Sequence, residues 1–469
     1  MNAKLVVILA INGVMFIVAS FVEYNYYATH EHQLPHHFSA TTYAARTDTA
    51  PYRHAEERPL LAGLAQMRKL GKSSWFAPLS TAAHDSTIPG DGSGGELSNA
   101  AVIVFAYNRT SYLEKTLESM AGLAGLDQVS LYVSQDGNFT GVRDLVQRMR
   151  ERLSPPHTRA FQYWQRERVA QLRPNQAGHA WLSQHYKWGL DRVFLERGHS
   201  HAIIVEDDML FSPDFLHFFK ATAVLLERDP SLWCISTWND NGLSTFDWDS
   251  KRMLRTSYFP GLGWMMRRQL WHEIGPDWPL QSWDHWMRLN TTAKGRECIA
   301  PEVNRNLNIG EKGANMDRRI FRKYLSIMSW NRQLISDYGN LSYLVQPQYS
   351  THMQQMVARA EHWQWRQQDI DHLDQRKVFL LTYKSEEYPE LAKSFKIWPF
   401  PRAHHKHVAV IPYRNSSFLL ADARFSPLLP PALKVLPSAN LTAVPAERQQ
   451  PCDTACLKWG LPLAYVAAA

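Results

Sequence analysis

Three consecutive acidic residues, Glu206, Asp207 and Asp208, follow an apolar run at residues 202–205 that predicts a buried strand. Carboxylates crowded at one strand end repel one another, and burying them costs free energy unless a cation holds them. A hard divalent ion such as Mg²⁺ or Mn²⁺ prefers oxygen ligands and can bridge carboxylates to phosphate oxygens. This acid triplet therefore predicts a metal and phosphate site, and a solvated acidic turn is the alternative.

A second candidate for chemistry is Asp284, which lies between Trp283 and Trp286 in the segment 283–288. Partial burial would raise the pKa of this carboxyl group and make it a better general base. The indole rings offer flat surfaces for the apolar face of a sugar. The alternative is that the tryptophans pack in a core and that Asp284 is a helix N-cap.

Alternating strands and helices must position these groups. The apolar runs predict strands at residues 100–107, 129–134, 159–166 and 202–205, and helices at 112–122, 140–153 and 179–196. Thr110 or Ser111 is the expected N-cap of the first helix. This order predicts an α/β fold whose parallel sheet has helices on both faces.

Polar residues follow the first two predicted strands, at Asn108-Arg109 and at Asp136. Because ligands of open α/β sheets bind at the carboxyl ends of the strands, these residues and the acid triplet are expected to line one crevice. The glycine-rich signatures of dinucleotide-binding and P-loop proteins do not occur.

Later segments contribute weaker signals. Residues 235–242 predict a strand and a turn, and residues 308–315 with Lys312 predict either a lid over phosphate or a plain surface turn. Strands at 408–413 and 417–420, joined by a turn near Arg414 and Asn415, predict a small β-containing C-terminal domain. The proline-rich tail from residue 426 is expected to be irregular.

Composition limits the class of protein. The chain has 469 residues, 45% of them hydrophobic, which suffices for a large core and two or three domains. The net charge of +7 is mild for this length, and without a dense basic run we expect no nucleic-acid partner. The four cysteines form no zinc pattern; Cys452 and Cys456 could close a small loop, whereas Cys234 and Cys298 would pair across the fold.

The amino terminus predicts a membrane anchor. Residues 5–22 are apolar and uncharged, and Lys4 precedes them, which favours an uncleaved signal anchor over a cleaved signal peptide. Residues 23–98, which end in a Gly/Ser-rich stretch, predict a stem. The rest of the chain is then lumenal, which agrees with an even cysteine count and with glycosylation sequons at Asn108, Asn138, Asn290, Asn340, Asn415 and Asn440.

Seven motifs in order carry a family resemblance: FAYNR at 105–109, SQDG at 134–137, HYKW at 185–188, IIVEDDM at 203–209, FPGLGWM at 259–265, SWDHWMR at 282–288 and GRECIAPEVNR at 295–305. Together they resemble glycosyltransferase family 13, whose members are single-pass type II Golgi membrane enzymes. The similarity covers residues 99–345 and implies a GT-A, or nucleotide-diphospho-sugar transferase, fold. It also implies four parts: cytoplasmic tip and anchor at 1–22, stem at 23–98, catalytic domain at 99–345, and C-terminal domain and tail at 346–469.

The resemblance further implies an inverting, Mn²⁺-dependent transfer of N-acetylglucosamine from UDP-GlcNAc to the 2-hydroxyl of a mannose on a glycoprotein. Carried over by motif, the substrate-binding residues are Arg109 and Asp136 at the uridine, His185 beside the nucleotide, Asp207 at the ribose, Glu206 at the donor sugar, Trp283 at the N-acetylglucosamine, and Asn315. Asp208 binds the metal and Asp284 is the catalytic base. Arg296 is expected to brace a closing loop at 308–317, and Cys234 and Cys298 match a family disulfide.

Some residues depart from the family pattern. Tyr107 and Gly137 occupy the positions of a second disulfide common in animal members. The loop sequence Gly-Ala-Asn-Met leaves two acceptors open, the α-1,3-arm mannose of N-glycans and O-linked mannose, and the short stem favours the first. Because Asp208 and Asp284 are both present, we expect an active transferase rather than a catalytically dead, lectin-like member.

Overall fold

The computed structural model describes residues 87–435, apart from residues 94, 96, 98, 169–176, 314–315 and 364–376. All of them belong to one unit, Lys72–Ala469. The predicted anchor, nearly all of the stem, Asn315, Cys452, Cys456 and the end of the tail lie outside the described residues. Within the described ranges, no helix is both long and apolar enough to cross a bilayer.

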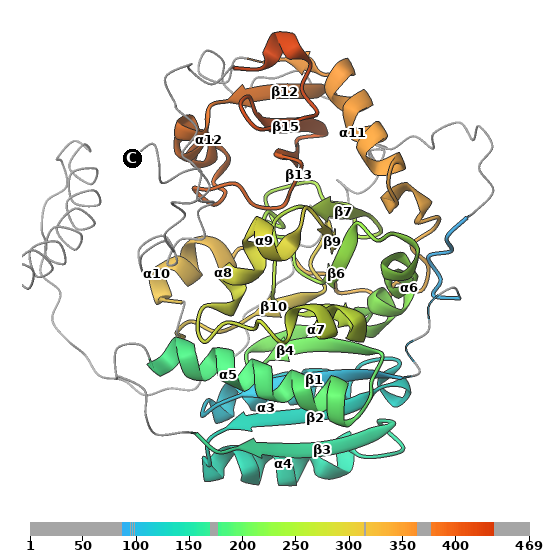
Figure 1. The fold of residues 1–469 in the computed structure, drawn as a ribbon, viewed down its shortest axis with the longest axis vertical. Helices are drawn as coiled ribbons and strands as arrows, with labels where there is room; N and C mark the ends of the chain where they lie inside the picture. Colours follow the sequence, from blue (N-terminus) through green and yellow to red (C-terminus); the bar gives the residue numbers. More distant parts are fainter. Residues whose placement is uncertain are drawn as a thin grey trace, which may run out of the picture. The chain divides into compact units, whose positions relative to one another are not determined.

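A central eight-stranded sheet has the order β3-β2-β1-β4-β8-β6-β9-β7 (Figure 1). Its strands are β1 Ala100–Ala106, β2 Ser130–Asp136, β3 Ala160–Arg166, β4 His201–Glu206, β6 Leu232–Ser236, β7 Met253–Thr256, β8 Trp264–Arg267 and β9 Glu297–Pro301. The first four are parallel, as expected, but β8 runs antiparallel to β4 and β6. The α/β class is therefore confirmed, whereas the prediction of a purely parallel sheet is wrong.

Helices cover both faces of this sheet because its strands alternate their side chains between two apolar clusters. Val102 and Val104 of β1 face one cluster with α3 Thr110–Ala121, α4 Thr140–Leu153 and α6 Phe215–Arg228. Ile103 and Phe105 face the other, with α5 Ala177–Asp191, α7 Arg268–Ile274 and α8 Trp283–Arg288. A π-helical turn, Arg192–Glu196, continues α5, and α9 Asn290–Ala293 follows α8.

The first helix begins two residues earlier than expected, at Thr110. Arg109, and not Thr110 or Ser111, is the N-cap of α3, and it makes no side-chain capping hydrogen bond. An arginine side chain has no acceptor for the N–H groups of the first turn, and this guanidinium group instead reaches the acid triplet at the neighbouring strand end.

A second sheet of five strands has the order β11-β12-β15-β14-β13. The strands are β11 Glu361–His362, β12 Val378–Tyr383, β13 His404–His405, β14 Val408–Tyr413 and β15 Ser416–Asp422, with helices α11 Gln348–Arg359 and α12 Tyr388–Phe395. The predicted hairpin is confirmed: Arg414 and Asn415 have φ values of 51° and 61°, as a two-residue turn between antiparallel strands requires.

Two smaller features connect distant parts of the chain. Strand β5 Met209–Phe211 pairs antiparallel with β10 Asn306–Asn308, directly after the acid triplet. A disulfide joins Cys234 on β6 to Cys298 on β9, which confirms that expectation. The remaining helical turns are α10 Arg318–Ile320, a π turn Phe321–Leu325, and 3-10 turns Leu126–Gln128, Ser342–Leu344, Ser385–Glu387 and Pro431–Leu433.

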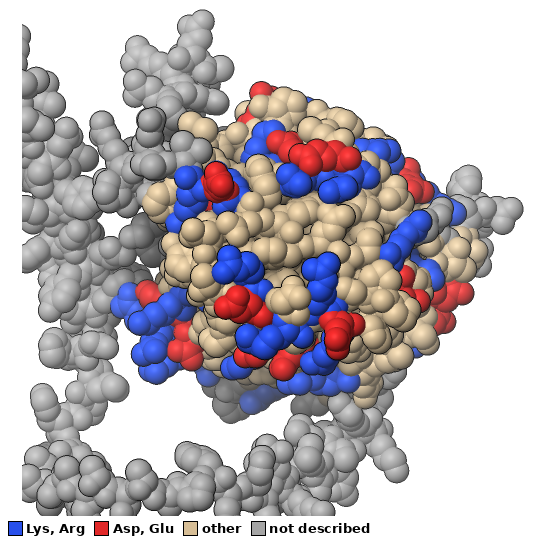
Figure 2. Space-filling model, turned by 90° about the horizontal axis from the view of Figure 1, so that it is seen from below, with Lys and Arg blue, Asp and Glu red and all other residues tan. Residues whose placement is uncertain are grey.

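The face beneath β3 and α4 carries charges of both signs. Figure 2 shows Lys and Arg side chains interspersed with Asp and Glu on this face. On α4 itself, the exposed Arg143, Arg148 and Arg150 alternate with Asp144 and Glu151. Mixed charge of this kind is typical of a solvated surface.

Candidate active site

The carboxyl ends of β1, β2 and β4 meet at one edge of the central sheet. In the strand register, Phe105 lies opposite Glu206, and Ala106 lies opposite Gln135. The residues that follow, Tyr107 to Arg109, Asp136 and the acid triplet, are therefore brought to the same edge, as the sequence predicted.

Arg109 is the counter-ion of the acid triplet. Its guanidinium group donates to Asp207 and forms an ion pair of 2.8 Å with the buried Asp208. It also donates to the carbonyl oxygen of Lys312 at 3.2 Å, so it connects the triplet to the predicted lid. Burial alone would lower the pKa of Arg109, but Asp208 and Asp207 outweigh burial and raise it above its ordinary value.

The acid triplet carries more negative charge than Arg109 can balance. Burial, together with Asp208, raises the pKa of Glu206 to about 7, and burial raises the pKa of Asp207 to about 6. Burial also raises the pKa of Asp208, although Arg109 opposes this. Two buried carboxyl groups and a half-buried one near a single guanidinium group favour the binding of a further cation.

The oxygen ligands suit a hard divalent ion. The amide of Asn308 donates to Asp208 at 3.2 Å and fixes the orientation of its carboxylate. Within the described ranges, no group of three or more His, Cys, Asp or Glu side chains is arranged to hold a metal. The carboxylate oxygens of Asp208 and Asp207 are ligands of the kind that a hard divalent ion prefers.

Tyr186 links the acid triplet to the segment that contains Asp284. Its hydroxyl group donates to Glu206 at 2.6 Å. Its ring stacks between Phe105, at 4.1 Å, and Trp283, at 4.4 Å between ring centroids. The two predicted centres of chemistry are therefore held together by one buried side chain.

Trp283 is itself buried and packs in an aromatic cluster with Trp264 and Trp278. This packing matches the alternative interpretation that the tryptophans belong to a core. Trp286 packs at the edge of the same cluster, against Trp278. A contact of Trp283 with a sugar stays a prediction.

Asp284 lies in the first turn of α8 and is partly exposed. Arg288, one helical turn further along, donates to it at 2.8 Å. Burial raises the pKa of Asp284, but Arg288 and His285 outweigh burial and lower it below its ordinary value. The expectation of a raised pKa is therefore wrong, because the sequence interpretation omitted the arginine. Asp284 is not an N-cap either, since Ser282 has that position.

Asp136 lies in a separate ionic cluster. Arg166 and Arg168 donate to its two oxygens at 2.7 and 2.8 Å, and the guanidinium group of Arg168 lies 3.7 Å from the ring centroid of Tyr107. Arg109 and Asp136, both expected at the uridine, thus have different partners in this structure. Tyr107 lies between them, because its backbone N–H faces Asp207 at 3.5 Å.

His185 is buried beneath the same edge of the sheet. A hydrogen bond of 2.8 Å joins its Nε2 to the hydroxyl group of Ser134, and Phe105 packs edge-on against its ring. Burial holds its pKa well below the ordinary value, and Arg166 and Arg168 add to this effect. His185 is therefore a neutral residue beside the Asp136 cluster.

The predicted lid begins in direct contact with Asp208. A Cβ added at Gly310 would overlap the Asp208 carboxylate, so only glycine allows this approach. The N–H of Gly310 donates to Asn308 at 2.9 Å. Asn315, the expected substrate ligand in the lid, lies outside the described residues.

Arg296 does not brace the described part of the lid. It donates to Glu273 on α7 at 2.9 Å and to carbonyl groups at the end of α9, and it lies over the ring of Trp233. The expected contact of Arg296 with the loop at 308–317 stays a prediction, since residues 314 and 315 lie outside the described residues. Arg109 instead makes the contact with the lid.

Several residues of the site were not predicted from the sequence. Tyr186 and Arg288 occur in the quoted motifs but had no role, and Arg166 and Arg168 were not singled out. The spacing of Asp284 and Arg288, four residues apart on a helix, is a signal that identifies their ion pair. The partners of Asp136 follow a neighbouring strand, and only the sheet order brings them together.

The fold and the site define an α/β glycosyltransferase. Residues 77–424 match the GNT-I family, and the chain belongs to this family. This confirms the resemblance that the seven motifs carry.

A known protein with a named activity is also similar to this chain. The chain is similar to the α-1,3-mannosyl-glycoprotein 2-β-N-acetylglucosaminyltransferase of Arabidopsis thaliana, with 34% identity over 327 residues, 68% of this chain and 72% of the relative. Among solved structures, it is similar to the mannosyltransferase PcManGT from Pyrobaculum calidifontis in complex with GDP-Man and Mn²⁺, with 18% identity, a TM-score of 0.31 and coverage of 57% and 70%. Residues 1–349 of TarS from S. aureus give 14% identity, a TM-score of 0.30 and coverage of 44% and 58%.

Proposed function

We propose that this protein transfers N-acetylglucosamine from UDP-GlcNAc, with inversion, in β-1,2 linkage to the α-1,3-arm mannose of N-glycans. Membership of the GNT-I family and the named activity of the Arabidopsis relative support this reaction. The single observation that carries it is the Tyr186 bridge, because its hydroxyl group donates to Glu206 and its ring stacks on Trp283, the residue next to Asp284. A donor diphosphate and an acceptor hydroxyl group need two such neighbouring centres.

Asp284 is the proposed base. It accepts the proton of the mannose 2-hydroxyl as the oxygen attacks the anomeric carbon and the bond from that carbon to the diphosphate breaks. Arg288 keeps Asp284 ionised, so that it can accept a proton near neutral pH. Because Asp284 is partly exposed, it is accessible to an incoming hydroxyl group.

The donor is proposed to bind along the carboxyl edge of the sheet. Arg109 and Asp136 would contact the uridine, Asp207 the ribose and Glu206 the donor sugar, with His185, Trp283 and Asn315 beside them. Asp208 would hold Mn²⁺, which when bound neutralises the charge that develops on the UDP leaving group. The lid at 308–317 then closes over the diphosphate, with its glycine at 310 against Asp208.

The cellular setting is part of the proposal. A type II signal anchor at residues 1–22 and a stem at 23–98 would hold a catalytic domain at 99–345 and a C-terminal domain at 346–469 in the Golgi lumen. The hydrophobicity of residues 5–22 and the disulfide between Cys234 and Cys298 support this arrangement, since disulfides persist in an oxidising lumen.

An assay of the full-length chain tests the reaction. With UDP-GlcNAc and Mn²⁺, we expect transfer to a mannose-terminated N-glycan in preference to an O-mannosyl peptide. Asp284→Asn should abolish transfer and retain UDP binding, whereas Asp208→Asn should weaken Mn²⁺ binding in calorimetry. Asp144→Asn on the exposed face of α4 is the matched control and should behave as the wild type.

Three results would contradict the proposal. Preference for the O-mannosyl peptide would reassign the acceptor. Glycan binding without turnover would indicate a lectin-like protein, and full activity of Asp284→Asn would exclude it as the base.

A further inference from the structure

The segment between α12 and β13 reaches from the C-terminal sheet to the turn that follows β6. Arg402 of this segment forms an ion pair of 2.8 Å with Asp240, and its carbonyl oxygen accepts a hydrogen bond from Asn241 at 3.2 Å. Asp240 and Asn241 belong to the WNDNG turn, to which the proposed reaction assigns no role. Two parts of the chain more than 150 residues apart are thus held together here.

This contact lies beside the proposed base. The ring of Tyr258 is flanked by two guanidinium groups, that of Arg288 at 4.7 Å and that of Arg402 at 5.3 Å from the centroid. Arg288 in turn donates to Asp284. One aromatic ring therefore separates the Arg402–Asp240 pair from the group that would deprotonate the acceptor.

Neighbouring polar atoms in this region lack hydrogen-bond partners among the described residues. They are Asp240 Oδ2, Asn241 Oδ1, Tyr258 Oη, Trp398 Nε1 and Arg402 Nε. Asp240 and Asn241 are 3% and 1% exposed, so bulk solvent does not satisfy them. Buried polar atoms in folded proteins almost always have partners, so this group of atoms needs partners from outside the described chain, as ordered water or a polar ligand supplies.

Aromatic rings and balanced charge define what this molecule is. The guanidinium carbon of Arg402 lies 4.0 Å from the ring centroid of Trp398 and 4.6 Å from that of Phe400, and both rings are partly exposed. Two guanidinium groups, Arg288 and Arg402, face two carboxylates, Asp284 and Asp240. A site without net charge, with aromatic surfaces and both donors and acceptors, suits the hydroxyl groups and apolar face of a neutral sugar.

We propose that Arg402, Asp240 and Phe400 form the acceptor subsite, where Arg402 and Asp240 hydrogen bond to the mannose-terminated saccharide, Phe400 packs against it, and its reactive hydroxyl group is placed at Asp284. This inference rests on the proposed function. It means that residues outside the seven motifs bind the acceptor saccharide. It also assigns a role in acceptor recognition to the C-terminal sheet, from which the Arg402 segment comes.

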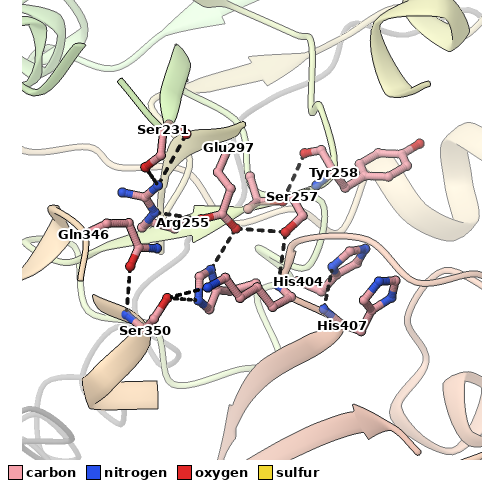
Figure 3. Close-up of polar contacts among 12 residues, drawn as sticks. Ser231, Arg255, Ser257, Tyr258, Glu297, Gln346, Ser350, His404 and His407 are labelled. Carbon is pink, nitrogen blue, oxygen red and sulfur yellow. Dashed lines mark hydrogen bonds and ion pairs between the residues drawn. The ribbon is translucent and has the colours of Figure 1, made fainter. Parts of the chain in front are cut away.

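A buried polar network anchors this segment (Figure 3). The N–H of Ser257 donates to the carbonyl oxygen of His404 at 2.7 Å, two residues after Arg402. His405 and the Ser257 hydroxyl group bond the same oxygen of Glu297, at 2.7 and 2.8 Å, and Arg255 bonds its other oxygen at 2.8 Å. Because Tyr258 follows Ser257 directly, the network also fixes the ring against which Arg402 packs.

Kinetics of the full-length chain test the subsite. Arg402→Ala and Phe400→Ala should each raise the KM for a mannose-terminated oligosaccharide at least tenfold. UDP-GlcNAc binding in calorimetry, and the slow hydrolysis of UDP-GlcNAc without acceptor, should stay within twofold of the wild type. Arg402→Lys, which keeps the charge and loses the planar fork, should give an intermediate KM. Arg148→Ala on α4 is the matched control.

The outcomes separate this inference from the proposed function. If the wild type transfers to mannose and Arg402→Ala has an unchanged acceptor KM, only the subsite is overturned. The subsite is also overturned if Arg402→Ala weakens donor binding as much as it weakens acceptor use. If the wild type does not transfer to mannose, the proposed function fails first. Circular dichroism of each variant shows whether it is folded. If Arg402→Ala does not fold, the acceptor KM of Arg402→Lys tests the subsite instead.

Discussion

The guanidinium group of Arg288 donates to Asp284 at 2.8 Å, one turn further along the same short helix. Arg288 also donates to the carbonyl oxygen of Phe259 at 3.1 Å, so it is fixed from a second direction. The proposed base thus has a permanent cationic neighbour. Burial is the largest single influence on the pKa of Asp284 and raises it, but Arg288 together with His285 outweighs burial and lowers that pKa.

Replacing Arg288 by Gln should move the pH dependence of transfer. Without the cation, burial raises the pKa of Asp284, and the acid limb of the kcat/KM profile shifts to higher pH by about one unit. Arg288→Lys keeps the charge and should leave the limb nearly in place. The measurement is kcat/KM between pH 4 and pH 8, and an unshifted limb in Arg288→Gln would show that another group titrates there.

Gly310 and Gly313 form a matched pair in the lid. A Cβ at Gly310 would overlap the Asp208 carboxylate, whereas a Cβ at Gly313 would have its nearest neighbour at 3.9 Å. Gly310→Ala should therefore reduce kcat/KM about 100-fold, as displacement of a reacting group by about 1 Å can do. Gly313→Ala should stay within a few-fold of the wild type. Equal activities of the two variants in the transfer assay would exclude this close approach.

The metal-free protein should lose stability as the pH rises. The folded-state pKa values of Glu206 and Asp207, about 7 and about 6, lie above their ordinary values of 4.5 and 3.8. The folded state therefore binds more protons than the unfolded state in this window, and stability falls between about pH 4 and pH 7. The measurement is Tm in EDTA at pH 5 and pH 8.

Added Mn²⁺ and UDP should remove most of this difference, because the cation stabilises the ionised carboxylates. Asp208→Asn has one carboxylate fewer, so the difference in Tm between pH 5 and pH 8 should be smaller in this variant when no metal is present. If Tm shows the same pH dependence with and without Mn²⁺ and UDP, the acid triplet does not bind the ion.

Glu297 should stabilise the contact between the two sheets. Burial raises its pKa, but His405 and Arg255 outweigh burial and lower it to about 2. Its contribution is therefore present above pH 4.5 and is lost as the pH falls toward 2. Glu297→Gln leaves the buried Arg255 with fewer partners and should lower the free energy of unfolding by about 3 kcal/mol.

Urea unfolding of Glu297→Gln and the wild type at pH 7 and pH 3 checks this. The difference between the two proteins in the free energy of unfolding should be smaller at pH 3 than at pH 7. Glu302→Gln is the control. Burial raises the pKa of Glu302 to about 7, so the effect of Glu302 on the free energy of unfolding has the opposite pH dependence. A constant difference across this range would mean that Glu297 acts through packing and not through its charge.

The sequence predicted the elements and the strand-end residues of the site well. Residues 140–153 form α4 as expected, and the acid triplet follows β4 as expected, because both depend on local hydrophobic periodicity. The position of β8 between β4 and β6 could not be predicted in this way. It depends on which strands bury each other's faces, and no local pattern encodes that choice.

The sequence by itself determined the family, the α/β class, and which residues are chemically suited to the reaction, since these follow from residue types and their order. Only the tertiary structure decided their partners: Arg109 binds Asp207 and Asp208, Arg166 and Arg168 bind Asp136, and Arg402 reaches Asp240. A carboxylate's pKa and role depend on the cations within a few ångströms, and folding brings these together from segments far apart in the chain.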